Sequence, residues 1–217
     1  MRIYVPTVQS RQEWILPRDP EDNFVLTELG GKAQPDWRPL EMEFLTEFDD
    51  GTARQHSDLP WCGEHVLMLR PRAVEALRPL LVQYGEILPL RCAEPVWLFN
   101  VTTTIDALDE DRSRIVRFDD GGGFLDIEEH VFWPERIGGA EIFKLPESPG
   151  GVHVSSIYLQ EGMVRRIGEL GLKGVAFRLV WSDETPAGEG IVEYPGEKRA
   201  VPAAGPFRKF MSSLFGR

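Results

Sequence analysis

The clearest pattern of apolar residues lies between residues 59 and 107, where a strand period changes to a helical period and then back. Residues 66–69 are all apolar and predict a buried strand. Residues 71–84 predict a helix because their apolar positions are spaced by three and four and share one face. These positions are Val74, Leu77, Leu80, Leu81 and Tyr84. Pro71 suits the first helical turn, and Pro79 should kink or shorten the helix. Strands are expected again near residues 97–102 and 105–108.

Shorter elements are expected on both sides of this region. Turn-forming residues separate apolar segments at 3–8, 13–16, 24–29 and 40–48, and residues 175–181 alternate as a strand with at least one buried face. Apolar residues at 115–118 and 124–127 flank the sequence Asp-Asp-Gly-Gly-Gly at 119–123. This arrangement predicts a hairpin, because glycine tolerates the positive φ values of tight turns.

A second helix is expected over residues 154–171. Ser155 or Ser156 could cap its start, and Gly171 could end it. Its apolar stripe would consist of Leu159, Met163, Ile167 and Leu170.

Together these elements predict an α+β fold, with a mixed or antiparallel sheet and two main helices, because strands and helices do not alternate regularly. Residues 1–181 should form one domain, with short N-terminal strands at 1–58 and the core at 59–181. Residues 182–206, rich in Pro, Gly, Ala and Glu, predict a loop or arm.

Residues 207–217 predict a short C-terminal amphipathic helix, whose apolar stripe is Phe207, Phe210, Met211, Leu214 and Phe215. So short a helix is marginal alone in water and needs a surface that covers its apolar face. That surface could belong to the protein's own body, to a partner or to an anionic membrane. We favour the protein's own body, because this segment is basic and the body is acidic.

Composition is that of one cytoplasmic domain. The chain has 217 residues, 42% of them hydrophobic, with six Trp and twelve Phe, which is enough for one substantial core. No apolar run approaches the roughly 20 residues of a membrane span, and the N-terminus lacks the pattern of a signal peptide. Cys62 and Cys92 have apolar neighbours and should be free thiols packed as small hydrophobic residues.

Charge distinguishes the chain more strongly than any motif. Its net charge is −11, and because five of the 24 basic residues and none of the 35 acidic ones lie from Lys198 onward, the preceding 197 residues carry −16. Such a body disfavours nucleic acid and anionic membranes as partners, and attracts basic proteins.

Carboxylates gather most closely between residues 106 and 129. The candidates for contact with a partner are Asp106, Asp109, Glu110, Asp111, Asp119, Asp120, Glu128 and Glu129; Asp126 lies among them. Arg112, Arg114 and Arg117 interrupt the segment, so one interpretation is a solvated hairpin with internal salt bridges. The other is a negative surface that meets a basic partner, since charge complementarity speeds association.

Residues with catalytic or metal-binding chemistry do not form a recognisable site. Cys62, His65 and Cys92 fall short of the four ligands of a structural zinc site, and the other histidines have no ligand spacing. The glycines at 121–123 follow two carboxylates and lead into a strand, unlike a phosphate-binding loop. No Gly-x-Ser-x-Gly motif occurs. We therefore expect no metal, no cofactor and no enzymatic activity.

The order of segments between residues 59 and 181 resembles a family of immunity proteins, the eleventh catalogued in bacterial polymorphic toxin systems. The resemblance rests on framework motifs, at residues 72–90, 98–109, 127–133, 142–146, 154–171 and 174–181. It implies a protein that binds and neutralises a toxin made by its own cell. Two alternatives stay open: a small intracellular hydrolase or metal-dependent enzyme with an unrecognised site, and a secretion-system adaptor that binds the toxin's delivery domain.

Overall fold

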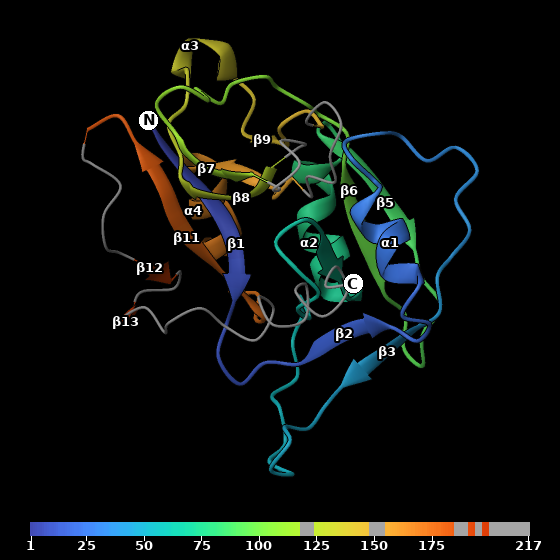
Figure 1. Cartoon of the computed structure of the whole chain (residues 1–217). Coiled ribbons are helices and arrows are strands. Elements are labelled where there is room, and N and C mark those ends of the chain that lie inside the picture. Colours follow the sequence, from blue (N-terminus) through green and yellow to red (C-terminus); the bar gives the residue numbers. More distant parts are fainter. Residues whose placement is uncertain (118–123, 148–154, 185–190, 194–196, 200–217) are drawn as a thin grey trace.

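The computed structural model describes residues 1–117, 124–147 and 155–184, together with the backbone of residues 191–193 and 197–199 (Figure 1). The helices in this part of the chain are α1 (Asp22–Thr27), α2 (Pro71–Leu81), α3 (Pro134–Ile137) and α4 (Glu161–Glu169). The strands are β1 (Arg2–Val8), β2 (Trp14–Pro17), β3 (Met42–Leu45), β4 (Leu67–Leu69), β5 (Gly85–Pro89), β6 (Trp97–Val101), β7 (Arg114–Arg117), β8 (Phe124–Glu129), β9 (Ile142–Phe143), β10 (Tyr158–Gln160), β11 (Val175–Ser182), β12 (Ile191–Glu193) and β13 (Glu197–Arg199).

Two antiparallel sheets form the frame of the molecule. One has the order β11-β1-β10-β9 and is called the β1 sheet; the other has the order β4-β6-β5 and is called the β6 sheet. The remaining strands pair as β2-β3, β7-β8 and β12-β13, also antiparallel. The predicted α+β fold is therefore confirmed, with antiparallel sheets.

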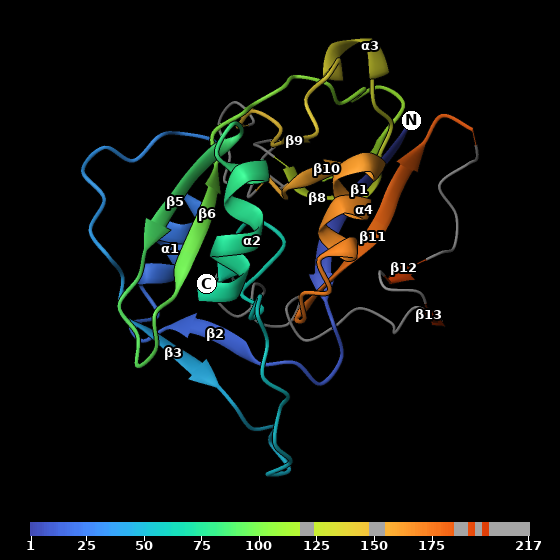
Figure 2. The same cartoon turned by 180° about the vertical axis from the view of Figure 1, so that it is seen from behind.

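Helices α2 and α4 join the two sheets into one core. They lie side by side in Figure 2, with α2 against the β6 sheet and α4 against the β1 sheet. Leu77 of α2, Met163 of α4, Phe99 of β6 and Leu159 of β10 are all fully buried in the same apolar cluster. Pro79 lies in the last turn of α2, which ends two residues later, in agreement with the expected shortening.

Two further clusters cover the opposite faces of the sheets. The β7-β8 hairpin covers the β1 sheet, where Phe132 packs edge-on against Tyr158 and Trp181 with ring centroids 5.3 and 5.9 Å apart. On the β6 sheet, α1 and the β2-β3 pair bury Leu26 and Leu29. Each sheet is thus covered on both faces.

The helix predicted over residues 154–171 is wrong in its first half. Residues 158–160 form β10, and α4 begins only at Glu161. The Ser155 hydroxyl accepts a backbone N–H at 2.9 Å near β9 and so does not cap the helix. Residues 157–159 are all buried because β10 is a central strand, and a continuous apolar run of this kind also fits a helical period. Gly171, with φ +60°, follows the end of the helix as expected.

Four other predicted segments differ from the structure or lie beyond what it describes. Residues 105–108 form an isolated bridge at Leu108 in place of a strand. The segment 182–206 contains the paired strands β12 and β13, so it is not a loop throughout. The predicted helix at 207–217 and the turn at 118–123 lie outside the described residues.

None of the helices that the structure describes has the length and apolar character needed to cross a membrane.

A buried ion pair connects the N-terminal strands to the start of α2. Arg70 donates a hydrogen bond to Glu13 Oε2 at 2.7 Å, and the two side chains are only 5% and 8% exposed. The same carboxylate oxygen accepts the Ser57 N–H at 2.9 Å, and Arg70 also donates to the Ser57 carbonyl at 3.2 Å. The guanidinium lies 4.1 Å from the centre of the Phe44 ring of β3. These contacts fix the positions of β2, β3, α2 and the loop before β4.

We expect the substitution Glu13→Gln to lower the free energy of unfolding by about 3 kcal/mol, because it removes the buried partner of Arg70 and leaves only an exposed carboxylate, that of Glu94, beside the buried charge. Urea unfolding followed by circular dichroism measures this change. Glu94→Gln is the control: Glu94 lies 3.4 Å from Arg70 but is 56% exposed, so its loss should change stability by less than about 1 kcal/mol. Equal effects of the two substitutions would contradict a dominant role for the buried pair.

Candidate partner-binding surfaces

The contact residues proposed from the sequence lie on the segment 106–129, called the acidic hairpin. Strands β7 and β8 pair, and Phe124 and Ile127 turn inward against the β1 sheet. Leu125 points away from the core and is 51% exposed. Asp119 and Asp120 lie outside the described residues. The outer side of β8 is therefore the face of the hairpin that a partner could reach.

Arginines neutralise most of the carboxylates on the acidic hairpin. The ion pairs are Glu128 and Glu129 with Arg114 at 2.9 and 2.8 Å, Glu110 with Arg117 at 2.9 Å, and Asp106 with Arg136 at 3.6 Å. Asp111 is exposed and makes no ion pair within the described part of the chain. The interpretation as a hairpin with internal salt bridges thus fits most of the segment. Contact of these residues with a partner stays a prediction.

Asp109 occupies a different position from the other candidates, because its side chain is only 4% exposed. Its Oδ1 accepts the Arg112 N–H at 3.2 Å, and its own N–H donates to the Val131 carbonyl at 2.8 Å. The Arg112 guanidinium is 3.6 Å from Oδ2. Asp109 therefore organises the turn that leads into β7 and does not present its carboxylate to a partner.

A second acidic segment, not singled out in the sequence analysis, runs from residue 19 to residue 50. It contains ten acidic residues and two basic ones. Within the described residues, the only ion pair made by one of these carboxylates is Glu41 with Arg91 at 3.5 Å. The density of negative charge is similar to that of the acidic hairpin, but here it is not neutralised by arginines. Counting acidic residues alone does not separate the two segments, whereas counting the arginines within reach of each does.

Helix α1 carries exposed apolar residues within this second segment. Leu26 and Leu29 face the core, but Phe24 and Val25 are 45% and 39% exposed. Of the exposed large apolar side chains that the structure describes, these two alone are adjacent in sequence. The stretch 19–28, with both apolar side chains and four carboxylates, is called the α1 surface. In Figure 2, α1 lies behind β5 and β6, and β8 lies behind β10, so the α1 surface and the acidic hairpin are on the same side of the molecule.

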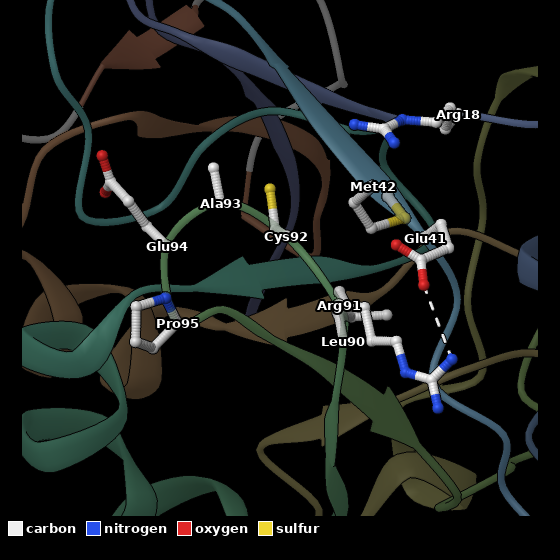
Figure 3. A pocket seen from close by; sticks show the side chains of 9 residues that line it. All are labelled: Arg18, Glu41, Met42, Leu90, Arg91, Cys92, Ala93, Glu94 and Pro95. Atoms are coloured by element: carbon white, nitrogen blue, oxygen red, sulfur yellow. Dashed lines mark hydrogen bonds and ion pairs between the residues drawn. The ribbon is translucent and has the colours of Figure 1, made fainter.

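A groove of about 490 Å³ opens beside the α1 surface, between the start of β3 and the turn that joins β5 to β6 (Figure 3). Buried Met42 and Leu90 contribute apolar surface to it, and Arg18, Glu41 and Arg91 contribute charged groups. Its lining contains Cys92 but no histidine, which is the usual base in activated cysteine nucleophiles. More of the surface of this groove is polar than apolar, so it suits a partner side chain that carries a polar or charged group.

Polar groups inside the core have strongly shifted pKa values but no catalytic arrangement. Burial lowers the pKa of Lys144 to about 8, and burial together with the nearby charge of Lys144 lowers the pKa of His65 to about 3. Burial also raises the pKa of the Cys62 thiol to about 12. A thiol held in its protonated form is a poor metal ligand, and no group of three or more potential ligands occurs among the described residues. Cys62 packs in the apolar cluster beneath α1, as expected, and half-buried Cys92 lies against it.

Tyr158 and His130 form a second buried polar contact, with the tyrosine oxygen 3.1 Å from His130 Nε2. Burial raises the pKa of Tyr158, so its hydroxyl stays protonated. The two rings also pack within the aromatic cluster over the β1 sheet. This contact stabilises the interior and supplies no nucleophile.

The comparison with known families bears on these surfaces. Residues 91–181 match the model of the Immunity protein family (Imm11). The resemblance proposed from the sequence is thereby confirmed for these residues. No curated protein matches the chain. The match to Imm11 includes the acidic hairpin and part of the groove, but the α1 surface lies outside it.

The buried amine of Lys144 generates a testable pH dependence. Its pKa is about 8 in the folded chain and 10.5 in its ordinary state. Between these values the unfolded chain binds more protons, so the contribution of Lys144 to stability should rise with pH, by about 3 kcal/mol over the interval. Below pH 8 both states are protonated and the unfavourable contribution is fully present.

The variant Lys144→Met should lack this rise, and it should be more stable than the native chain at pH 7, because it removes a buried charge. Unfolding measured at several pH values, with the exposed Lys173→Met as control, tests this expectation. Parallel pH profiles for the native chain and Lys144→Met would show that the amine is not buried as described.

Proposed function

We propose that this protein is an immunity protein that neutralises a cognate bacterial polymorphic toxin by tight, stoichiometric binding in the cytoplasm of the producing cell. The observation that carries the proposal is the match of residues 91–181 to the Immunity protein family (Imm11). The matched residues contain three of the four strands of the β1 sheet, together with α3, α4 and the acidic hairpin. The proposed activity is binding, with no catalytic step.

Protection of the producing cell sets the affinity that this function requires. Nearly complete occupancy at low free toxin needs a dissociation constant of about 1 nM or lower, which corresponds to about −12 kcal/mol. An interface of roughly 800 Å² on each partner can supply this energy if a few well-packed side chains form its centre. The toxin must therefore contact apolar anchor side chains on this protein and also the polar residues that surround these side chains.

The charge of the chain supports a basic toxin as the partner. The net charge of −11 attracts a basic surface over a distance of about one Debye length and raises the rate of encounter. On the acidic hairpin, Glu110 and Asp111 are exposed and are candidates for this role. Asp109 is buried and is therefore left out. We assign them to electrostatic steering, since exposed charges act mainly on association.

The direct test is reconstitution with the toxin-like protein that the proposal expects the reading frame immediately upstream to encode. Its toxic C-terminal domain, purified with and without this chain, should form a complex of defined stoichiometry on size-exclusion chromatography, with a nanomolar or lower dissociation constant. Expression of this chain should restore growth to cells that produce the toxic domain. Binding to the delivery domain alone would favour an adaptor. Absence of any complex would overturn the proposed function for this pair.

For the acidic hairpin, we expect the double substitution Glu110→Lys with Asp111→Lys to slow association with the toxic domain and to reduce its dependence on salt. Stopped-flow measurements at several ionic strengths report both effects. The control is Glu75→Lys, which makes the same type of charge reversal at an exposed position on another surface, helix α2. If the control slows association as much per unit charge as the hairpin variant, the effect comes from total charge and the hairpin has no special role.

A further inference from the structure

Helix α1 presents an apolar face that no other described part of the chain covers. In a six-residue helix anchored by Leu26, the neighbouring Phe24 and Val25 remain about two-fifths exposed. Exposure of one apolar side chain is common, but an exposed aromatic residue beside an exposed β-branched one, next to a groove with a mixed polar and apolar lining, is typical of a contact site.

The surroundings of these two residues are acidic. Asp19, Glu21, Asp22 and Glu28 belong to the same stretch of chain, and none of them makes an ion pair within the described residues. Arg18 stands at the edge of the stretch, where it also lines the groove. An apolar centre surrounded by carboxylates that make no ion pair in the described part of the chain complements a partner that offers an apolar side chain surrounded by Lys or Arg.

These charges also select among the possible occupants. A second copy of this chain would bring two sets of carboxylates together, and like charges oppose such a contact. A nucleic acid or an anionic membrane would be repelled for the same reason. A basic protein surface would gain from both the charges and the apolar pair.

We infer that the α1 surface is the contact that holds a basic segment of the cognate toxin, with Phe24 and Val25 as anchors and the groove receiving a neighbouring polar or charged side chain. This inference rests on the proposed function and adds a division of roles to it. The acidic hairpin, on the same side of the molecule, steers the encounter, and the α1 surface determines how slowly the complex dissociates.

The test measures binding of the purified toxic domain encoded upstream to the full chain and its variants. Phe24→Ala with Val25→Ala should weaken binding by at least about tenfold, mainly through faster dissociation, because buried apolar anchors act on the dissociation rate. Leu26 is untouched, so α1 should stay folded; an unchanged circular dichroism spectrum and melting temperature verify this. The matched control is Val8→Ala with Val82→Ala, which removes exposed valine side chains from β1 and from the end of α2 and should change the affinity by less than about twofold.

Each outcome has a defined meaning. Tight binding by the native chain and equally tight binding by the Phe24→Ala, Val25→Ala variant would overturn the inference and leave the proposed function standing. If the native chain does not bind the toxic domain, the proposed function and the inference fail together. Should Phe24→Ala with Val25→Ala convert a dimer of this chain into a monomer, the occupant would be a second copy and the inference would be wrong.

Hydrogen exchange on the full chain tests whether the chain's own basic C-terminal segment covers α1. If Phe210→Ser with Phe215→Ser accelerates exchange of the α1 amides in the absence of toxin, this segment covers α1 and the inference is overturned. Unchanged α1 exchange in that variant, with protection of residues 19–28 on addition of the toxic domain, supports the toxin as occupant.

Discussion

The Arg70–Glu13 ion pair is the interaction on which the arrangement of the two sheets depends most directly. Its charges are buried, so they are stable only if β2, the loop at residues 57–59 and the start of α2 meet in one geometry. The same loop also holds the turn before β11, since Leu59 donates its N–H to the Lys173 carbonyl at 2.8 Å. Gly174 beside it has φ +114°, and a Cβ there would overlap the Leu59 carbonyl. The loop thereby connects the N-terminal strands to both sheets.

Local patterns in the sequence predicted the elements whose periodicity has a single interpretation. The apolar face of α2, the alternation of β11 and the two strands of the acidic hairpin all follow from spacing and turn residues. Residues 157–159 could not be assigned in this way, because a strand buried on both faces shows no alternation. The pairing of Arg70 with Glu13 joins positions 57 residues apart, and no local pattern relates them.

The candidate contact surface could not be predicted from the sequence for a different reason. A run of carboxylates shows where the sequence places negative charge. The electrostatic potential at that surface also depends on which basic side chains lie close to the carboxylates in the folded chain. Arg114 and Arg117 lie within the acidic hairpin and form ion pairs with its carboxylates. No arginine or lysine pairs with the carboxylates of the α1 surface in the described structure. The exposure of Phe24 could not be predicted from the sequence either. Phe24 and Leu26 are both apolar, and only the packing of α1 shows that Leu26 is buried and Phe24 is exposed.

The division of the chain between framework and contact surface follows from these observations. The Imm11 match begins at Arg91 and ends at Trp181, so it includes most of the β1 sheet and excludes α1. Leu26 and Leu29 fix α1 on the β6 sheet through contacts that do not involve its exposed face. Substitutions at Phe24, Val25 or the carboxylates beside them would therefore change the surface offered to a toxin without removing a core contact. In the proposed binding mode, such substitutions alter the choice of partner while the buried ion pair and the sheets remain unchanged.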